Sequence, residues 1–225
     1  MSLEGAATSL ASAGIGAVFA FLVFRQWTVR RKEYQLAWTL GLSLFAIAAF
    51  TQFLAEAYGW SVGVYRIYYF VAAPLVAVLG VGSAFLASRR FGLAFSVYTA
   101  VLTAGFAWVV FTSPVNPAAL QQSIPAGEGF ARSVRIWTPL FTVPGSLALI
   151  GIALYSYWRT RLPFNLGIAA GAIVAAGSGS LATLGLTWVL YLGELIGIAL
   201  MFWGFLASRE PSEVPRPAAG KLPSS

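Results

Sequence analysis

The sequence predicts an all-α integral membrane protein with seven transmembrane helices. Three observations predict this fold: the composition, the length of the apolar runs and the placement of Lys and Arg. Of the 225 residues, 59% are hydrophobic and 9% are charged, and the mean hydropathy is +0.79, whereas soluble domains carry about 25% charged residues. Water therefore cannot be the main solvent of this chain.

Apolar runs of roughly 17 to 25 residues, without the alternation of strands, follow one another along the chain. As a helix, each run can cross about 30 Å of hydrocarbon with its backbone hydrogen bonds satisfied internally. The predicted spans are 8–24, 35–57, 63–87, 92–112, 136–158, 164–184 and 185–207. A single re-entrant segment is the alternative for the last two, which are separated only by 183–187. One continuous helix there would be about 65 Å long, so we expect seven spans and not six.

The basic residues predict the orientation of these spans. Of the 14 Lys and Arg residues, 11 fall on one side and three on the other, which the positive-inside rule assigns to the cytoplasm and the exterior. The N-terminus is therefore expected outside and the C-terminus in the cytoplasm. The cytoplasmic set is Arg25, Arg30, Arg31, Lys32, Arg89, Arg90, Arg159, Arg161, Arg209, Arg216 and Lys221, and the external set is Arg66, Arg132 and Arg135.

The remaining segments are short. The first 24 residues lack the positive n-region of a signal peptide, so we expect a retained first span. The longest connection, 113–135, is rich in Pro and Gly, and we expect at most a short surface helix at about 118–122. Residues 1–210 thus form the seven-helix domain, and 211–225 are expected to be a disordered cytoplasmic tail.

Several classes of function are excluded by missing residue types. The chain has no Cys and no His, and all seven of its acidic residues are Glu. It therefore lacks the usual ligands of haem, zinc and iron–sulfur clusters, and the Cys- or His-based nucleophile systems of many hydrolases. We expect no cofactor, no metal site and no enzymatic activity. The net charge of +7 gathers at span ends, which indicates a membrane surface and not nucleic acid.

Two pairs of similar segments indicate an internal repeat. Residues 85–89 and 205–209 are both Phe-Leu-Ala-Ser-Arg, at an offset of 120. The loops after the first and fifth spans are also alike in their Trp and Arg residues. Two three-helix units joined by the fourth span would explain both pairs, as in transporters built from parallel repeats. The alternative is that an apolar helix followed by arginine is common to membrane proteins in general.

The layout resembles those of two known families. Seven spans with an external N-terminus resemble the microbial rhodopsins, which bind their pigment through a lysine in the last helix. The lysines here, Lys32 and Lys221, lie outside the spans, so a covalent retinal is excluded. The three-plus-one-plus-three layout is similar to that of the SWEET sugar transporters. The chain has none of the Pro-Gln pairs of the wider PQ-loop family.

Glu194 is the most informative single position, because an uncompensated acid inside a span costs on the order of 3 kcal/mol. Together with Thr187 and Tyr191 it forms a polar stripe at helical spacing, which continues to Ile198 and Met201. Burial away from a cation favours the neutral, protonated carboxyl group. We interpret Glu194 as part of a proton or cation site. The structural alternative is a neutral Glu hydrogen-bonded to a neighbouring helix.

A second polar group is predicted at the outer ends of the second and third spans. Arg66 lies there, on a helix whose Tyr65, Tyr68 and Tyr69 share one face. The Arg66 side chain either extends to the lipid headgroups, or pairs with Glu56 at the end of the second span, or reaches towards Glu194. Gln52 lies four residues before Glu56 and extends the same polar edge. In the second interpretation, Arg66, Tyr69, Glu56 and Gln52 form the mouth of an outward-facing cavity.

Prolines occur in the third and fifth spans, and closely spaced glycines occur in the sixth. We expect Gly167, Gly171, Gly177 and Gly179 to serve close helix packing more than contact with a solute. Pro74, Pro139 and Pro144 are expected to kink the third and fifth spans.

These features favour a small carrier or permeation protein for a small solute, an ion or a proton. We expect it in the cell membrane, as a multi-pass protein of a prokaryotic inner membrane. The alternative is a non-transporting sensor, or an assembly subunit of a larger membrane complex. The expected partners are the lipid bilayer, a solute or proton, and a second copy or a membrane partner, with no nucleic acid.

Overall fold

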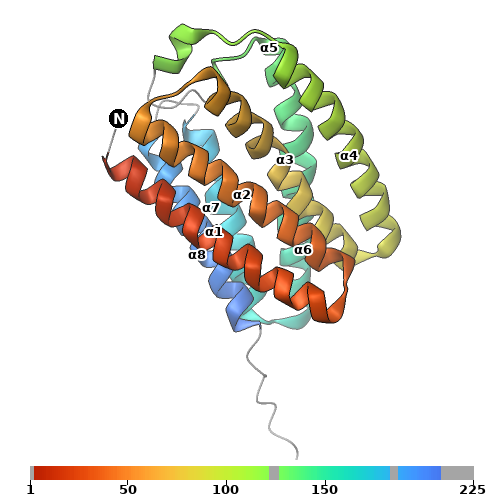
Figure 1. Cartoon of the computed structure of the whole chain (residues 1–225). Coiled ribbons are helices and arrows are strands. Elements are labelled where there is room, and N and C mark those ends of the chain that lie inside the picture. The colour runs from red at the N-terminus through yellow and green to blue at the C-terminus, as the bar shows by residue number, and fades with distance from the viewer. Residues whose placement is uncertain (1–2, 122–126, 183–186, 209–225) are drawn as a thin grey trace, which may run out of the picture.

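The structure, a computed structural model, describes residues 3–121, 127–182 and 187–208. In these ranges the chain forms long α-helices joined by short turns (Figure 1). A 3-10 helix, η1 (Pro117–Gln121), and a short helix, α5 (Arg132–Arg135), lie in the connection between α4 and α6. The long helices are α1 (Leu3–Arg30), α2 (Glu33–Tyr58), α3 (Val62–Ala87), α4 (Arg89–Thr112), α6 (Trp137–Thr160), α7 (Pro163–Ala182) and α8 (Thr187–Ala207).

Six segments are long and apolar enough to cross a membrane, namely α1, α2, α3, α4, the continuous stretch of α5 and α6, and α8. The apolar stretch of α7, Pro163–Gly179, is shorter. The chain is therefore a multi-pass helical membrane protein. The predicted runs 35–57, 63–87 and 92–112 fall inside α2, α3 and α4.

At the end of the chain, α7 and α8 are separate helices that pack side by side. Because the apolar stretch of α7 is shorter than those of the six long segments, the count of seven spans stays a prediction. Glycines allow the close approach of α7 and α8: a methyl group on Gly171 would lie 2.5 Å from the carbonyl oxygen of Gly197. The predicted packing role is confirmed for Gly167, which lies against Trp203, and for Gly171. Gly177 and Gly179 instead face open space.

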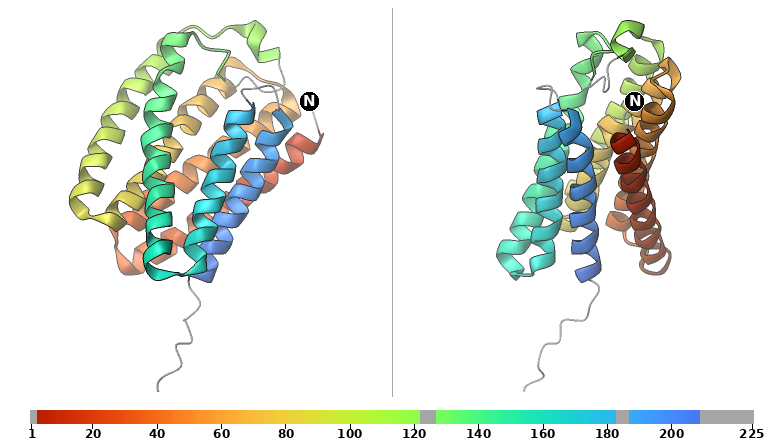
Figure 2. Two further views of the ribbon diagram at one scale, coloured as in Figure 1. Left: turned by 180° about the vertical axis from the view of Figure 1, so that it is seen from behind. Right: turned by 90° about the vertical axis from the view of Figure 1, so that its left-hand side faces the viewer.

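The contacts between neighbouring helices close a ring in the order α1, α2, α3, α6, α7, α8. α4 packs outside this ring against α3, at the edge of the bundle (Figure 2). Successive long helices alternate in direction, so α1, α3, α6 and α8 begin at the same end (Figure 1). We call this the N-terminal end. The opposite end, where α1, α3 and α6 reach turns that carry Arg31, Lys32, Arg89 and Arg161, is called the basic end.

The half of the ring nearer the basic end is filled by an apolar plug. Buried side chains from five helices meet there: Phe19, Leu42, Leu79, Leu149 and Met201. A cavity of about 30 Å³ remains between them. Its apolar lining offers a water molecule no hydrogen-bond partner, so we expect the plug to be a dry layer between the two ends of the ring interior.

A second core stabilises the N-terminal end outside the ring. It is built from aromatic rings of α3, α4, α6 and the α4–α6 connection: Tyr65, Tyr69, Phe106, Phe130 and Phe141. The predicted surface helix near 118–122 corresponds to η1, although residues 122–126 lie outside the described ranges. The connection was not expected to contain α5.

The prolines act differently from one another. Pro74 and Pro144 lie inside α3 and α6. Pro139 lies in the first turn of α6, three residues after Ile136, the residue that separates α5 from α6, and the kink expected at Pro139 stays a prediction. Beside Pro144, Gly145 allows α3 and α6 to cross closely, because a methyl group there would lie 2.7 Å from the backbone nitrogen of Ala77.

The predicted tail, 211–225, lies outside the described residues.

Candidate functional site

Four of the predicted cavity residues, two on α2 and two on α8, meet inside the ring through direct hydrogen bonds. Gln52 Nε2 donates to Glu194 Oε1 at 3.2 Å. Tyr191 OH donates to Glu56 Oε1 at 2.5 Å. Because α2 and α8 are not neighbours in the ring, both bonds cross its interior.

Helix geometry explains why these two bonds form together. Gln52 and Glu56 are four residues apart on α2, and Tyr191 and Glu194 are three apart on α8, so each pair occupies one helical face. The two helices run in opposite directions (Figure 1). Gln52, the first residue of the α2 pair, therefore meets Glu194, the second of the α8 pair, and Glu56 meets Tyr191.

Tyr68 brings α3 into the same network. Gln52 Nε2 donates to Tyr68 OH at 3.2 Å as well as to Glu194, which occupies both hydrogens of the amide. Gln52 Oε1 is buried and has no hydrogen-bond partner among the described residues. Since Gln52 is only 1% exposed, the chain leaves a strong acceptor inside the ring.

Two buried serines of α1 lie at about the same level of the ring. Ser9 and Ser12 are each 1% exposed, and their Oγ atoms have no partner within the described ranges. A methyl group on Gly16 of α1 would lie 2.8 Å from the Phe45 ring of α2, and from this antiparallel contact Ser9 is level with Gln52. The Phe19 contacts with Phe202 and Phe205 place Ser9 level with the Glu194 region of α8 as well.

We call these residues the polar cluster: Ser9, Ser12, Gln52, Glu56, Tyr68, Tyr191 and Glu194. Its deepest members are well enclosed, with Glu56 4% and Tyr191 7% exposed. Tyr68 and Glu194 retain partial exposure. The cluster lies nearer the N-terminal end than the apolar plug, so any access from the basic end is closed by the plug.

Oxygen atoms dominate the chemistry of the polar cluster. Glu194 forms no ion pair within the described ranges, where the recorded salt bridge joins Glu33 and Arg89. Those ranges also contain no group of three or more His, Cys, Asp or Glu residues that could hold a metal ion. Carboxyl, amide and hydroxyl groups without a fixed cation can bind a proton, a monovalent cation or a polar solute.

The structure places Arg66 outside the polar cluster. Its Nη1 and Nη2 donate to the backbone carbonyls of Val110, at 2.5 Å, and Ser113, at 2.7 Å. These carbonyls belong to the C-terminal end of α4, where a positive charge is favoured by the helix dipole. Within the described ranges Arg66 forms no ion pair with Glu56 or Glu194, and its extension towards the lipid headgroups stays a prediction.

The structure does not place the other predicted residues in the polar cluster either. Tyr69 belongs to the second core, where its ring packs against Phe106 and Phe130, and its OH group shares a hydrogen bond of 2.9 Å with Thr138 Oγ1 of α6. Thr187 begins α8, but its side chain lies outside the described part of the structure. Ile198 and Met201, which extend the stripe of Glu194, belong to the apolar core.

Comparison with known proteins gives no assignment. No protein-family model matches the chain, and no curated protein or solved structure is similar to it. The function must therefore be inferred from the site itself.

Sequence reasoning missed the α1 part of the cluster. Ser9 and Ser12 are small residues in an apolar helix, and such residues usually serve helix packing. Their three-residue spacing was the available signal, because it places both hydroxyl groups on the same face.

Proposed function

We propose that this protein is a small carrier or permeation protein for a proton, a monovalent cation or a small polar solute, and that the polar cluster is its binding site. The observation that carries the proposal is Glu194, an acid inside an apolar helix that is held by Gln52 from across the ring. An acid at mid-span costs about 3 kcal/mol and is typical of ion and proton pathways.

The atoms without partners support the same function. Ser9 Oγ, Ser12 Oγ and Gln52 Oε1 are buried without a partner in the described ranges, and each such atom costs about 1–3 kcal/mol. Stability alone would favour alanine at both serines. Acceptors gathered at the level of a carboxyl group are instead useful for binding a proton or cation that is not part of the chain.

The apolar plug supports a gated route. It closes the ring between the polar cluster and the basic end, and a dry apolar layer is a barrier to charged and polar species. In the proposed cycle, the polar cluster exchanges with one side of the membrane while the plug is closed. Separation of the plug residues then opens the cluster to the other side.

Two similar turns at the basic end support an internal duplication of a three-helix unit. α1 and α6 both end in an arginine with a left-handed backbone, Arg31 at φ 50° and Arg161 at φ 58°. The N–H of each arginine donates four residues back, to Trp27 at 2.8 Å and to Tyr157 at 2.7 Å. Both turns are followed by a helix that begins two residues later.

The ends of α3 and α8 also correspond. The N–H of Ser88 donates to Ala84 at 3.0 Å, and the N–H of Ser208 donates to Gly204 at 3.1 Å, within the repeated Phe-Leu-Ala-Ser motif. Exchange of α1, α2 and α3 with α6, α7 and α8 leaves the order of the ring unchanged. This is the arrangement expected of a parallel repeat with its site at the interface of the two units.

In the proposed arrangement α7 is the sixth of seven spans. Its 20 residues correspond to about 30 Å of helix, the thickness of the hydrocarbon layer. The N-terminal end then faces the exterior of a cell membrane and the basic end faces the cytoplasm, as the positive-inside rule requires.

Flux measurements in proteoliposomes test the proposal. Purified protein is reconstituted with a pH-sensitive or Na⁺-sensitive dye inside, and influx is followed after an imposed gradient. Glu194→Gln keeps the size and the hydrogen-bonding capacity of the side chain but removes its charge, so we expect at least a tenfold loss of flux. Glu4→Gln is the matched control, because Glu4 is an exposed acid in the first turn of α1.

Two results would count against transport. The first is equal flux through wild type and Glu194→Gln. The second is an absence of flux together with a stoichiometric membrane partner that co-purifies in mild detergent, which would favour a sensor or an assembly subunit.

A further inference from the structure

A groove on the rim of the ring lies outside the polar cluster and has a different chemistry. It runs between α1 and α2, has a volume of about 440 Å³ and is open on one side. This volume falls within the roughly 300–1,000 Å³ of typical small-ligand sites. Its lining is mostly apolar: Ala17, Ala20, Phe21, Phe24, Thr39, Ser43, Ala46 and Ile47.

The hydroxyl groups in this groove do not make it polar. Thr39 Oγ1 donates to the backbone carbonyl of Gln35 at 2.8 Å, and Ser43 Oγ donates to that of Thr39 at 2.8 Å. Both donors are therefore satisfied by the α2 backbone, so the groove presents an apolar surface. The α1 residues from Ala17 to Phe24 cover seven steps, or about 10 Å of helix, which is most of the hydrocarbon thickness of one leaflet.

Cations stand at the end of the groove nearer the basic end. Along α1, Ala17, Phe21 and Arg25 follow one another at four-residue spacing, so Arg25 continues a row that lines the groove. Along α2, the row of Ser43 and Thr39 continues towards Lys32, just before the helix begins. A third cation, Arg31, lies 4.6 Å from the ring centre of Trp27.

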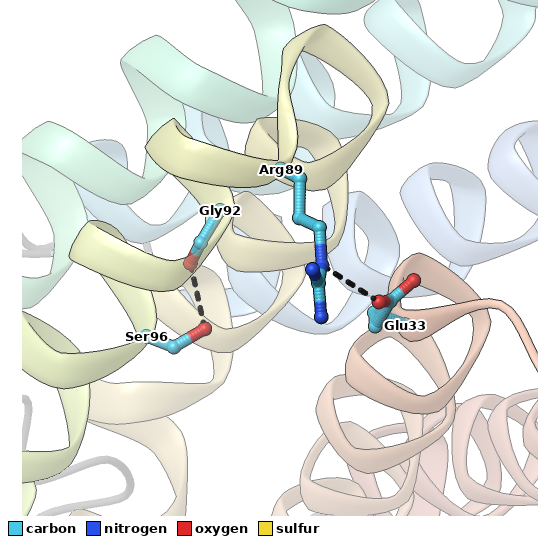
Figure 3. A network of polar contacts seen from close by, with 4 residues as sticks. All are labelled: Glu33, Arg89, Gly92 and Ser96. Carbon is cyan, nitrogen blue, oxygen red and sulfur yellow. Dashed lines mark hydrogen bonds and ion pairs between the residues drawn. The ribbon is translucent and has the colours of Figure 1, made fainter.

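Two of these cations are not held in an ion pair in the part of the chain that the structure describes. Within the described ranges, Arg25 and Lys32 form no ion pair, and Glu33, the acid next to Lys32, is held by Arg89 Nε at 3.3 Å (Figure 3). Arg25 and Lys32 are both exposed. An apolar channel with exposed cations at its mouth matches an acyl chain attached to a negatively charged phosphate.

We propose that the α1–α2 groove is a binding site for an anionic phospholipid, with an acyl chain along Ala17 to Phe24 and the phosphate between Arg25 and Lys32. A second copy of the protein fits the groove less well. In the same membrane, a second copy in the same orientation would place its own basic end beside these cations. The site is independent of the polar cluster, so the proposal does not rest on transport.

Lipid binding to the full-length protein tests this site. Native mass spectrometry in mild detergent is used to titrate palmitoyl-oleoyl phosphatidylglycerol against phosphatidylcholine with the same chains. A basic side chain near an anionic group contributes about fivefold in affinity, so two predict about a 25-fold preference for phosphatidylglycerol. Arg25→Gln with Lys32→Gln should abolish this preference, whereas Arg159→Gln with Arg161→Gln, at the corresponding turn after α6, should preserve it.

A groove-filling variant tests the acyl-chain part separately. Ala17→Phe should weaken the binding of both lipids, because Ala17 is an exposed residue of the lining. Ala100→Phe, at an exposed position of α4, should leave binding unchanged. Thermal unfolding in detergent checks that each variant is folded.

Three outcomes would overturn the proposal. They are equal affinity for the two lipids, an equal loss of preference in the Arg159 and Arg161 variant, and full competition by inorganic phosphate, which would show an anion site without a role for the groove.

Discussion

The hydrogen bond between Tyr191 and Glu56 can be tested by removing one oxygen atom. Tyr191→Phe leaves the buried ring in place, since Tyr191 is 7% exposed, but it removes the donor to Glu56 Oε1. Hydrogen bonds to charged groups contribute about 1.5–3 kcal/mol in soluble proteins, and bonds between membrane helices average about 0.6 with a maximum near 1.7 kcal/mol. A short, buried bond to a carboxyl group belongs near the upper membrane value. We expect the free energy of unfolding to fall by about 1.5 kcal/mol.

The control for this variant is Tyr98→Phe. Tyr98 OH donates to the backbone carbonyl of Leu140 at 2.7 Å, in an exposed position between α4 and α6. We expect a loss of about 0.5 kcal/mol there, because exposed groups exchange this bond for another partner at little cost.

The assay is unfolding in mixed micelles with increasing dodecyl sulfate, followed by tryptophan fluorescence and circular dichroism. A double-mutant cycle of Tyr191→Phe and Glu56→Met, in which the methionine has no oxygen acceptor for the tyrosine hydroxyl, isolates the pairwise energy. The expected coupling energy is about 1 kcal/mol. A coupling energy near zero, or equal effects of Tyr191→Phe and Tyr98→Phe, would refute the reasoning from this bond.

Two further predictions concern the framework. Gly171→Ala should destabilise the protein by about 1–3 kcal/mol, because the new methyl group would overlap the Gly197 carbonyl at the α7–α8 contact. Gly177 faces open space, so Gly177→Ala should be neutral or stabilising by up to about 1 kcal/mol. Unfolding in mixed micelles measures both variants, and similar losses of stability would disprove the glycine contact. Arg66→Gln should lower the free energy of unfolding by about 1 kcal/mol through loss of its bonds to the end of α4, and it should leave flux unchanged. A flux defect in folded Arg66→Gln protein would instead return Arg66 to the transport site.

The helices could be predicted from the sequence because the solvation of each apolar run depends mainly on its own residues. The predicted runs 35–57, 63–87 and 92–112 lie within two or three residues of the ends of α2, α3 and α4. The α7–α8 boundary was less certain, because no charged residue separates the two runs in the sequence. Glycine contacts between the two helices, which depend on tertiary packing, determine how they pair.

The polar cluster could be predicted in part for a similar reason. Gln52, Glu56, Tyr191 and Glu194 are costly in an apolar helix, and their spacing places each pair on one face. Which helices face each other was not available from local patterns. Arg66 was therefore assigned to the wrong neighbour, because nothing in its surrounding sequence indicates that the end of α4 supplies its acceptors.

The central claim is that the polar cluster exchanges with water from the N-terminal end while the plug stays dry. The chain has no Cys, so a single thiol reports one position, and Ser9→Cys and Leu79→Cys probe the cluster and the plug. With a membrane-impermeant maleimide added to vesicles from the side of the N-terminal end, Ser9→Cys should react and Leu79→Cys should stay unmodified. Protection of both thiols, or reaction of Ser9→Cys only from the side of the basic end, would contradict the account.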